Sequence, residues 1–187
     1  MKKILLIASL CASIISFSQD KVTPVIKQGS RFAYIVHTAG QDVNFSSSID
    51  SVSAGYLKLG WDIEGLGTGG WIMKKNSLEK ATNGYWDQPL AGSDVELSDD
   101  QTVLVLSRAQ WDGIQKEKKF VFEQKTFSLK TPSEQQVLKL KGRPIDAIMA
   151  EAENGFRVWL LNNASFPVLL KIENNPKGVD LELTSID

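Results

Sequence analysis

The stretch with the strongest suggestion of chemistry is GLGTGG at residues 65–70, which has the G-x-G-x-x-G spacing of a dinucleotide-binding loop. Such a loop needs a strand before the glycines and, after them, a helix whose N-terminus meets the pyrophosphate. The strand is present, but the WIMKK segment that follows is short and is broken by Asn76-Ser77. No Gly-Lys-Ser/Thr is present to make a Walker loop. The pattern therefore predicts a hairpin or bulge that leads into a strand at 71–73, with no cofactor.

A second pattern, Ser77-Leu78-Glu79-Lys80, matches the S-x-x-K of penicillin-binding enzymes. Those enzymes also need S-D-N and K-T-G elements. In this chain Ser93-Asp94 is followed by Val95, and Lys125-Thr126 by Phe127. We therefore interpret Ser77 as a helix cap and Lys80 as a surface residue.

Histidine and cysteine chemistry is nearly absent from the sequence. His37 is the only histidine and follows a strand pattern beside a turn, and Cys11 is the only cysteine. A Ser-His-Asp mechanism needs a histidine base, and zinc sites usually need two or more His or Cys ligands. We predict that His37 is a turn residue, that there is no metal site of this kind, and that an enzyme is the least favoured class.

Carboxylates gather in the irregular segment, where Asp99 and Asp100 are adjacent and Asp87, Asp94 and Glu96 lie close in sequence. Paired carboxylates can act as acid and base in glycosidases, and oxygen ligands can hold calcium. No D-x-D-x-D-G loop is present. The favoured interpretation is solvated or capping side chains, with a calcium site as the open alternative.

Aromatic side chains are a better indication of binding. Trp61 and Trp159 lie on strand patterns and are most simply core residues, whereas Tyr85-Trp86 lies in a Gly/Pro-rich loop that is harder to bury. We interpret Tyr85 and Trp86 as candidates for a pocket wall or a contact surface, with plain packing as the alternative.

The first residues have the pattern of a secretory signal peptide. Lys2-Lys3 precede an apolar run from Ile4 to Ile15, and Ser16-Phe17-Ser18 places small residues at a cleavage site after Ser18. The run is shorter than the roughly 20 residues that span a bilayer, and no later run is long enough. Leu10 before Cys11 does not fit a lipoprotein signal. We expect an exported periplasmic or extracellular protein, with a signal peptide at 1–18 and one domain at 19–187.

The charge balance excludes some partners. The whole chain has a formal net charge of −1, and removing the two lysines of residues 1–18 leaves a mature charge of −3. No Lys/Arg cluster forms a basic stripe, so we expect neither nucleic acid nor a strongly anionic membrane surface as a partner.

Alternation of apolar and polar residues dominates the rest of the chain. It predicts strands at 31–37, 42–52 and 56–63, and a meander of hairpins in the C-terminal half. One helix is expected at 108–117, because Ser107 and Gln110 fit a capping box. The predicted fold is mainly β: a curved antiparallel sheet or half-barrel with about ten strands and one short helix.

One hairpin of this meander is apolar on both faces. Asn154-Gly155 predicts a two-residue type I′ turn, which would pair Met149 with Leu160 and Ala150 with Trp159. A sheet with one solvated face would be polar on one side. Something must therefore cover the second face: a helix, a loop, another sheet layer or a ligand.

The C-terminal residues carry a resemblance to a known family. Val158-Trp159-Leu160, Phe166-Pro167, the strand Leu170 to Glu173 and the turn from Asn175 to Gly178 resemble the end of periplasmic half-barrel proteins of the LolA/LolB type. The whole chain is also similar to uncharacterised secreted proteins of Gram-negative bacteria. The resemblance implies a curved sheet with a concave apolar cavity for acyl chains.

Together these patterns favour non-catalytic binding of a hydrophobic or amphiphilic ligand such as a lipid. The candidate lining residues are Met149, Val158, Trp159, Leu160, Tyr85 and Trp86. The alternative is an envelope protein–protein interaction module that has no small-molecule site and whose contact surface lies in the 83–97 loop.

Overall fold

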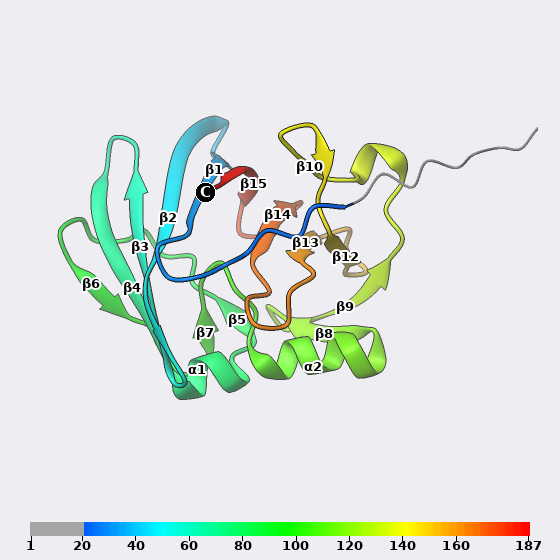
Figure 1. The fold of residues 1–187 in the computed structure, drawn as a ribbon, viewed down its shortest axis with the longest axis horizontal. Coiled ribbons are helices and arrows are strands. Elements are labelled where there is room, and N and C mark those ends of the chain that lie inside the picture. Colours follow the sequence, from blue (N-terminus) through cyan, green and yellow to red (C-terminus); the bar gives the residue numbers. More distant parts are fainter. Residues whose placement is uncertain (1–20) are drawn as a thin grey trace, which may run out of the picture.

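A computed structural model describes residues 21–187, and the predicted signal peptide with its cleavage site lies outside them. The described chain is mainly β, with one large sheet that does not close on itself, as predicted. Figure 1 shows this sheet bending around an interior, with the helices together at one end. No helix in 21–187 is long and apolar enough to cross a membrane.

Eleven strands form the main sheet of the described chain, antiparallel except for the β4–β6 pair at one edge. In order across the sheet they are β6 (Asp94–Glu96), β4 (Gly67–Lys74), β3 (Tyr56–Ile63), β2 (Gln41–Ser53), β1 (Arg31–Thr38), β15 (Val179–Ile186), β14 (Leu169–Glu173), β13 (Arg157–Leu161), β12 (Ala147–Glu151), β9 (Lys125–Lys130) and β8 (Lys119–Phe122). The helices are α1 (Lys75–Lys80), α2 (Arg108–Glu117) and a short 3-10 helix (Glu134–Gln136). Two pairs of two-residue strands lie outside the main sheet: β5 (Asn83–Gly84) with β7 (Gln101–Thr102), and β10 (Lys139–Leu140) with β11 (Arg143–Pro144).

The glycine run forms a hairpin, which confirms the prediction made from its flanks. Strand β4 begins at Gly67 and continues past Gly70 to Lys74, so no helix begins at the glycines. Gly65 lies in the turn at φ +79°, a conformation that side chains with a Cβ rarely adopt. A Cβ on Gly69 would lie 2.5 Å from Cζ2 of Trp61 and 2.6 Å from the carbonyl oxygen of Ser93. The glycines therefore serve a tight turn and close packing between strands.

The turn between β12 and β13 differs from the predicted type I′ turn. Gly155 has a positive φ of +81° but Asn154 does not, and the Ala152 N–H donates to the Phe156 carbonyl oxygen at 2.9 Å. This is a three-residue loop with glycine in the left-handed position. The extra residue shifts the pairing by one, so Met149 lies opposite Trp159 and not Leu160.

This shift sorts the hairpin side chains differently between the two faces, because directly opposed residues share a face. Met149 and Trp159 lie on the convex face, and Val158 and Leu160 lie on the concave one. The convex face is covered by a loop, since the Trp159 Nε1–H donates to the Gln136 carbonyl oxygen at 3.0 Å. The side chain of Lys171 also covers the Trp159 ring, with Nζ 5.7 Å from its centroid.

Type I′ geometry occurs instead at a turn with no glycine. Phe122 pairs with Lys125 across β8 and β9, and the two residues between them, Glu123 and Gln124, have φ angles of +50° and +59°. Residues with a Cβ are strained in this region, by about 1–2 kcal/mol each. Other contacts of the turn, described below, must offset that strain.

The helix predicted at 108–117 is confirmed with the same bounds. Ser107 Oγ accepts the Gln110 N–H, and the Ser107 N–H donates to Gln110 Oε1 at 2.9 Å, which makes the expected capping box. Trp111 and Ile114 point inward and are buried. A second, shorter helix, α1, begins at Lys75, two residues before Ser77, the residue interpreted above as a helix cap.

Candidate functional site

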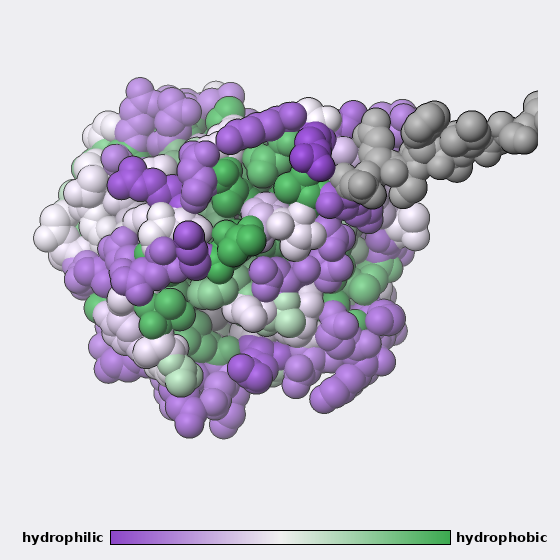
Figure 2. Space-filling view, in the orientation of Figure 1, coloured by the Kyte–Doolittle hydropathy of each residue, from purple (hydrophilic) through white to green (hydrophobic). Residues whose placement is uncertain are grey.

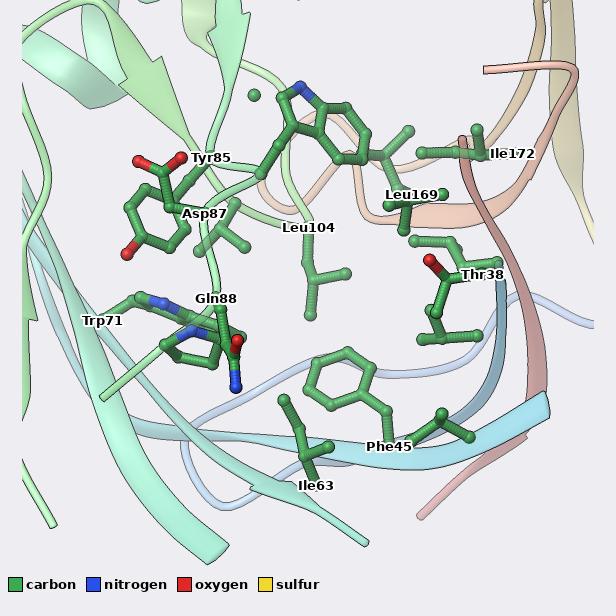
Figure 3. Close-up of a pocket in the computed structure, with 18 of the residues that line it drawn as sticks. Thr38, Phe45, Ile63, Trp71, Tyr85, Asp87, Gln88, Leu104, Leu169 and Ile172 are labelled. Atoms are coloured by element: carbon green, nitrogen blue, oxygen red, sulfur yellow. The ribbon is translucent and has the colours of Figure 1, made fainter. Parts of the chain in front are cut away.

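An apolar cavity of about 590 Å³ lies between the concave face of the sheet and the segment 84–89, which we call the cover segment. The side chains labelled in Figure 3 surround an open centre. The residues that line the cavity are Val36, Thr38, Val43, Phe45, Ile63, Glu64, Gly65, Leu66, Trp71, Gly84, Tyr85, Trp86, Asp87, Gln88, Pro89, Thr102, Val103, Leu104, Phe122, Leu169, Ile172, Val179 and Leu181.

One wall of the cavity is a row of aliphatic side chains that crosses four strands. Val43 on β2 lies opposite Val36 on β1, Val36 lies opposite Leu181 on β15, and Leu181 lies opposite Ile172 on β14. Because opposed residues share a face, the register alone places all four on the concave side. Val36 and Val43 are half-buried, so this wall is partly open to solvent.

A second wall is aromatic. The ring of Trp71 meets the rings of Phe45 and Tyr85 edge to face, at centroid separations of 6.0 and 6.3 Å. The buried indole N–H groups of Trp61 and Trp71 have no hydrogen-bond partner among the described residues. Each unpaired buried donor costs about 1–3 kcal/mol. Packing of the rings, and not hydrogen bonding of these indoles, therefore stabilises this wall.

The cover segment is held by the carboxylate of Glu123, from the strained β8–β9 turn. Glu123 Oε1 accepts the backbone N–H of Gly84 and the indole Nε1–H of Trp86, each at 2.7 Å. The backbone N–H of Glu123 donates to the Thr82 carbonyl oxygen at 3.0 Å. Hydrogen bonds to a charged acceptor are the stronger kind. These contacts explain why the turn keeps two residues at positive φ, and they fix the position of the Trp86 wall.

The edge of the cavity is polar and acidic. Glu64 and Asp87 are exposed, and Glu64 Oε2 accepts the amide N–H of Asn44 at 2.6 Å. Burial, and after it the charge of Asp87, raise the pKa of the Tyr85 hydroxyl above its usual range. Figure 3 shows the Asp87 carboxylate beside the Tyr85 ring. Within 21–187, no lysine, arginine or histidine lines the cavity.

The structure separates the residues that the sequence analysis grouped as candidate lining. Tyr85 and Trp86 line the cavity, in contact with the core. Val158 and Leu160 lie on the concave face but are fully buried, beside Leu169 and Ile172, and do not reach the cavity. The convex-face pair Met149 and Trp159 faces away from it.

Sequence reasoning missed the aliphatic wall, although a pattern for it was present. Val36 and Val43 lie at alternating positions of the first two predicted strands, and Leu181 and Ile172 on strands near the C-terminus. Alternation shows that such residues face inward, but not that the row they form is left partly uncovered. Only the path of the cover segment decides that.

The residues considered for catalysis do not come together. Ser77 is buried as the third residue of α1, where its hydroxyl donates to the Gln101 carbonyl oxygen, so the prediction of a helix cap was wrong. Lys80 is exposed, as predicted. His37 is an exposed residue next to the β1–β2 turn, with Nδ1 2.6 Å from Asp42 Oδ1.

The adjacent acids are surface hydrogen-bond acceptors. Asp99 accepts from the Asn76 amide at 2.9 Å, and Asp100 accepts from Ser98 at 2.7 Å and from Asn83 at 3.0 Å. The hydrogen bonds from Ser98 and Asn83 lower the pKa of Asp100 below its usual range. In the part of the chain that the structure describes, no group of three or more His, Cys, Asp or Glu side chains could hold a metal ion.

The chain was compared with known proteins, and no protein family, curated protein or solved structure matches it. The cavity offers apolar contact area and a few polar groups at one edge, which is the usual composition of a binding site for an apolar or amphiphilic molecule.

Proposed function

We propose that this chain is an exported, non-catalytic binding protein that holds a hydrophobic or amphiphilic ligand in the cavity beneath the cover segment. The observation that carries the proposal is the partly open row of Val36, Val43, Leu181 and Ile172, faced by Tyr85 and Trp86. A chain that buried this row only for stability would close it with its own side chains, since interiors pack with few voids larger than a water molecule.

The size of the cavity fits an alkyl chain. At roughly 30 Å³ for each non-hydrogen atom, close to the volume per molecule of liquid water, 590 Å³ holds about twenty atoms. Burial contributes about 0.8 kcal/mol for each methylene, so a chain of twelve carbons gains roughly 10 kcal/mol, against a cost of association that begins at about 4 kcal/mol. A lipid or a detergent-like molecule meets both conditions.

Titration with N-phenyl-1-naphthylamine, whose fluorescence rises in apolar sites, tests the proposal. We expect one saturable site in the purified chain and at least tenfold weaker binding by Val43→Phe, because the larger ring fills the cavity. Val121→Phe is the matched control, since Val121 is an exposed strand residue on β8 away from the cavity. Equal binding by wild type and Val43→Phe, or no binding by either, would contradict the proposal.

The nature of the ligand can be tested in the native host. Protein purified from that host is extracted with organic solvent, and the extract is examined by mass spectrometry. An acyl or alkyl compound in a one-to-one ratio supports the proposal, provided that Val43→Phe purified in the same way yields less of it. A protein that carries no such compound, although it is stable and monodisperse, counts against a lipid ligand.

A second candidate function, an envelope interaction module, is favoured by one observation. Leu90 in the 83–97 loop is 69% exposed, which leaves its apolar side chain available to a partner. Under this alternative Leu90→Ser would abolish capture of a specific envelope partner and leave binding of the naphthylamine probe unchanged. Under the ligand-binding proposal, Leu90→Ser changes neither the capture of a partner nor the binding of the naphthylamine probe.

A further inference from the structure

The charged groups at the cavity edge bear on the chemistry of the ligand. Of the residues that line the cavity within 21–187, only Glu64 and Asp87 are charged, and both are carboxylates. Fatty acids, phospholipids and sulfated detergents carry an anionic end, which a binding site normally meets with arginine or lysine. This cavity offers none.

The two carboxylates belong to neighbouring segments. Glu64 lies at the start of the β3–β4 turn, and Asp87 lies in the cover segment. The backbone continues from the cover segment along β4, where the Gly92 N–H donates to the Thr68 carbonyl oxygen at 2.7 Å. A Cβ on Gly67 would lie 3.3 Å from the Cβ of Ala91, so the residues just after the cover segment contact the start of β4, three residues after Glu64.

Both carboxylates are available to a ligand. Asp87 makes no side-chain hydrogen bond or ion pair within the described residues, and Glu64 accepts one hydrogen bond, from the neutral amide of Asn44. No cation in 21–187 forms an ion pair with either group. A third carboxylate, Glu123, lies behind Trp86 and also accepts only from neutral donors. The field at the cavity edge is therefore negative.

The aromatic residues at the same edge favour a cation as well. Tyr85 and Trp86 are half-buried, and a cation within about 6 Å of an aromatic ring gains roughly 0.5–1 kcal/mol at exposed sites. Carboxylates beside aromatic rings at the mouth of an apolar cavity are the complement of an ammonium group on an alkyl chain.

We propose that the cavity takes a long-chain amphiphile whose polar end is cationic, such as an alkyl amine or quaternary ammonium compound. This inference rests on the proposed function, since it assumes that the alkyl chain occupies the cavity. The ammonium lies between Glu64 and Asp87, and the chain lies along the Val43 to Ile172 row. Neutral amphiphiles bind more weakly, and anionic ones bind most weakly.

Three probes of equal chain length test the charge preference: dodecylamine, dodecanol and dodecanoate at pH 7.5, each below its micelle concentration and each measured by displacement of the naphthylamine probe. We expect the amine to bind at least about tenfold more tightly than dodecanoate, with the alcohol between them. The ratio should fall in 0.5 M NaCl, because salt screens the carboxylates at the edge.

Isosteric variants show whether these two carboxylates are responsible. The double variant Glu64→Gln, Asp87→Asn should bring the amine-to-acid ratio to within about threefold, by weakening amine binding and strengthening dodecanoate binding. Asp62→Asn is the matched control, because Asp62 is an exposed carboxylate on β3 that lies outside the cavity. Thermal unfolding of each variant confirms that it is folded.

The possible outcomes are distinct. If dodecanoate binds as tightly as the amine, or if the double variant keeps the full ratio, the inference about charge is wrong although the cavity still binds alkyl chains. If the wild-type chain binds neither the naphthylamine probe nor any of the three dodecyl compounds, the proposed function is wrong as well.

Discussion

The hydrogen bonds of Glu123 make the most direct test of how the cavity wall is built. Removing this carboxylate by Glu123→Ala takes away the acceptor of the Gly84 N–H and the Trp86 Nε1–H, both at 2.7 Å. A hydrogen bond to a charged group contributes about 1.5–3 kcal/mol, and these two share one oxygen on a half-buried side chain. Two independent bonds of this kind would contribute about 3–6 kcal/mol, and because these two share one oxygen we expect the free energy of unfolding to fall by less, about 2–3 kcal/mol.

Differential scanning calorimetry measures this change. For a chain of this size each kcal/mol corresponds to about 2–4 °C, so the melting temperature should fall by about 4–12 °C. Affinity for the naphthylamine probe should fall with it, because the 84–86 part of the cover segment is no longer tied to the β8–β9 turn. Glu123→Gln keeps a neutral acceptor and should lose about half as much.

Glu153→Ala is the matched control for this test. Glu153 is also a carboxylate in a hairpin turn, but it is exposed and makes no side-chain hydrogen bond or ion pair among the described residues. It should melt within 1–2 °C of the wild type, as expected of surface substitutions away from such contacts. If Glu123→Ala melts no lower than Glu153→Ala and binds the probe equally well, Glu123 does not hold the cover segment.

Three further substitutions test other parts of the fold. Gly69→Ala should cost about 1–3 kcal/mol in urea unfolding, because its Cβ would overlap the Trp61 ring and the Ser93 carbonyl oxygen; unchanged stability would show that β4 can move away freely. Gln124→Gly should raise the free energy of unfolding by about 0.5–1 kcal/mol, since glycine adopts φ +59° without strain; a loss of stability would refute the strain argument. Burial raises the pKa of the Tyr34 hydroxyl, which donates to the Leu169 carbonyl oxygen, so the folded state keeps a proton that the unfolded state releases near pH 10. The free energy of unfolding should therefore fall as the pH rises above about 10, and Tyr34→Phe should lessen that fall, as measured by urea titrations from pH 8 to 11.5.

The difference between the predicted and the observed β12–β13 turn shows what local sequence can and cannot decide. Asn-Gly is compatible with a two-residue type I′ turn and with a longer loop that needs only the glycine at positive φ. The structure uses the second, which places Met149 opposite Trp159, and the carbonyl oxygen of Gln136 accepts the Trp159 indole N–H. Gln136 lies 23 residues before Trp159 and outside the hairpin, so no pattern within the hairpin could have predicted this contact.

The path of the N-terminal segment, which lies along an apolar part of the surface, also depends on contacts that are distant in sequence. Figure 2 shows apolar atoms gathered in the middle of one face, along and beside the N-terminal segment, with polar atoms around them. Val25 in this segment is 81% exposed, whereas its neighbour Ile26 packs against the core. Val22 pairs with Ile145 in an isolated bridge. The short run at 21–30 carries no clear strand pattern, and its path is set by these distant contacts.

The sequence by itself determined the first three strands and α2. Alternation marked β1, β2 and β3, and the Ser107–Gln110 box marked α2, because these patterns depend on backbone geometry within a few residues. It also identified Tyr85 and Trp86 as aromatic residues that a loop cannot easily bury.

The tertiary structure alone decided where the cavity lies. The row from Val43 to Ile172 exists because strands from both ends of the chain pair in one register, and it stays partly open because Glu123 holds the cover segment at Gly84 and Trp86. Both conditions depend on contacts between residues tens of positions apart, and the free energy of such contacts depends on packing that local patterns do not encode.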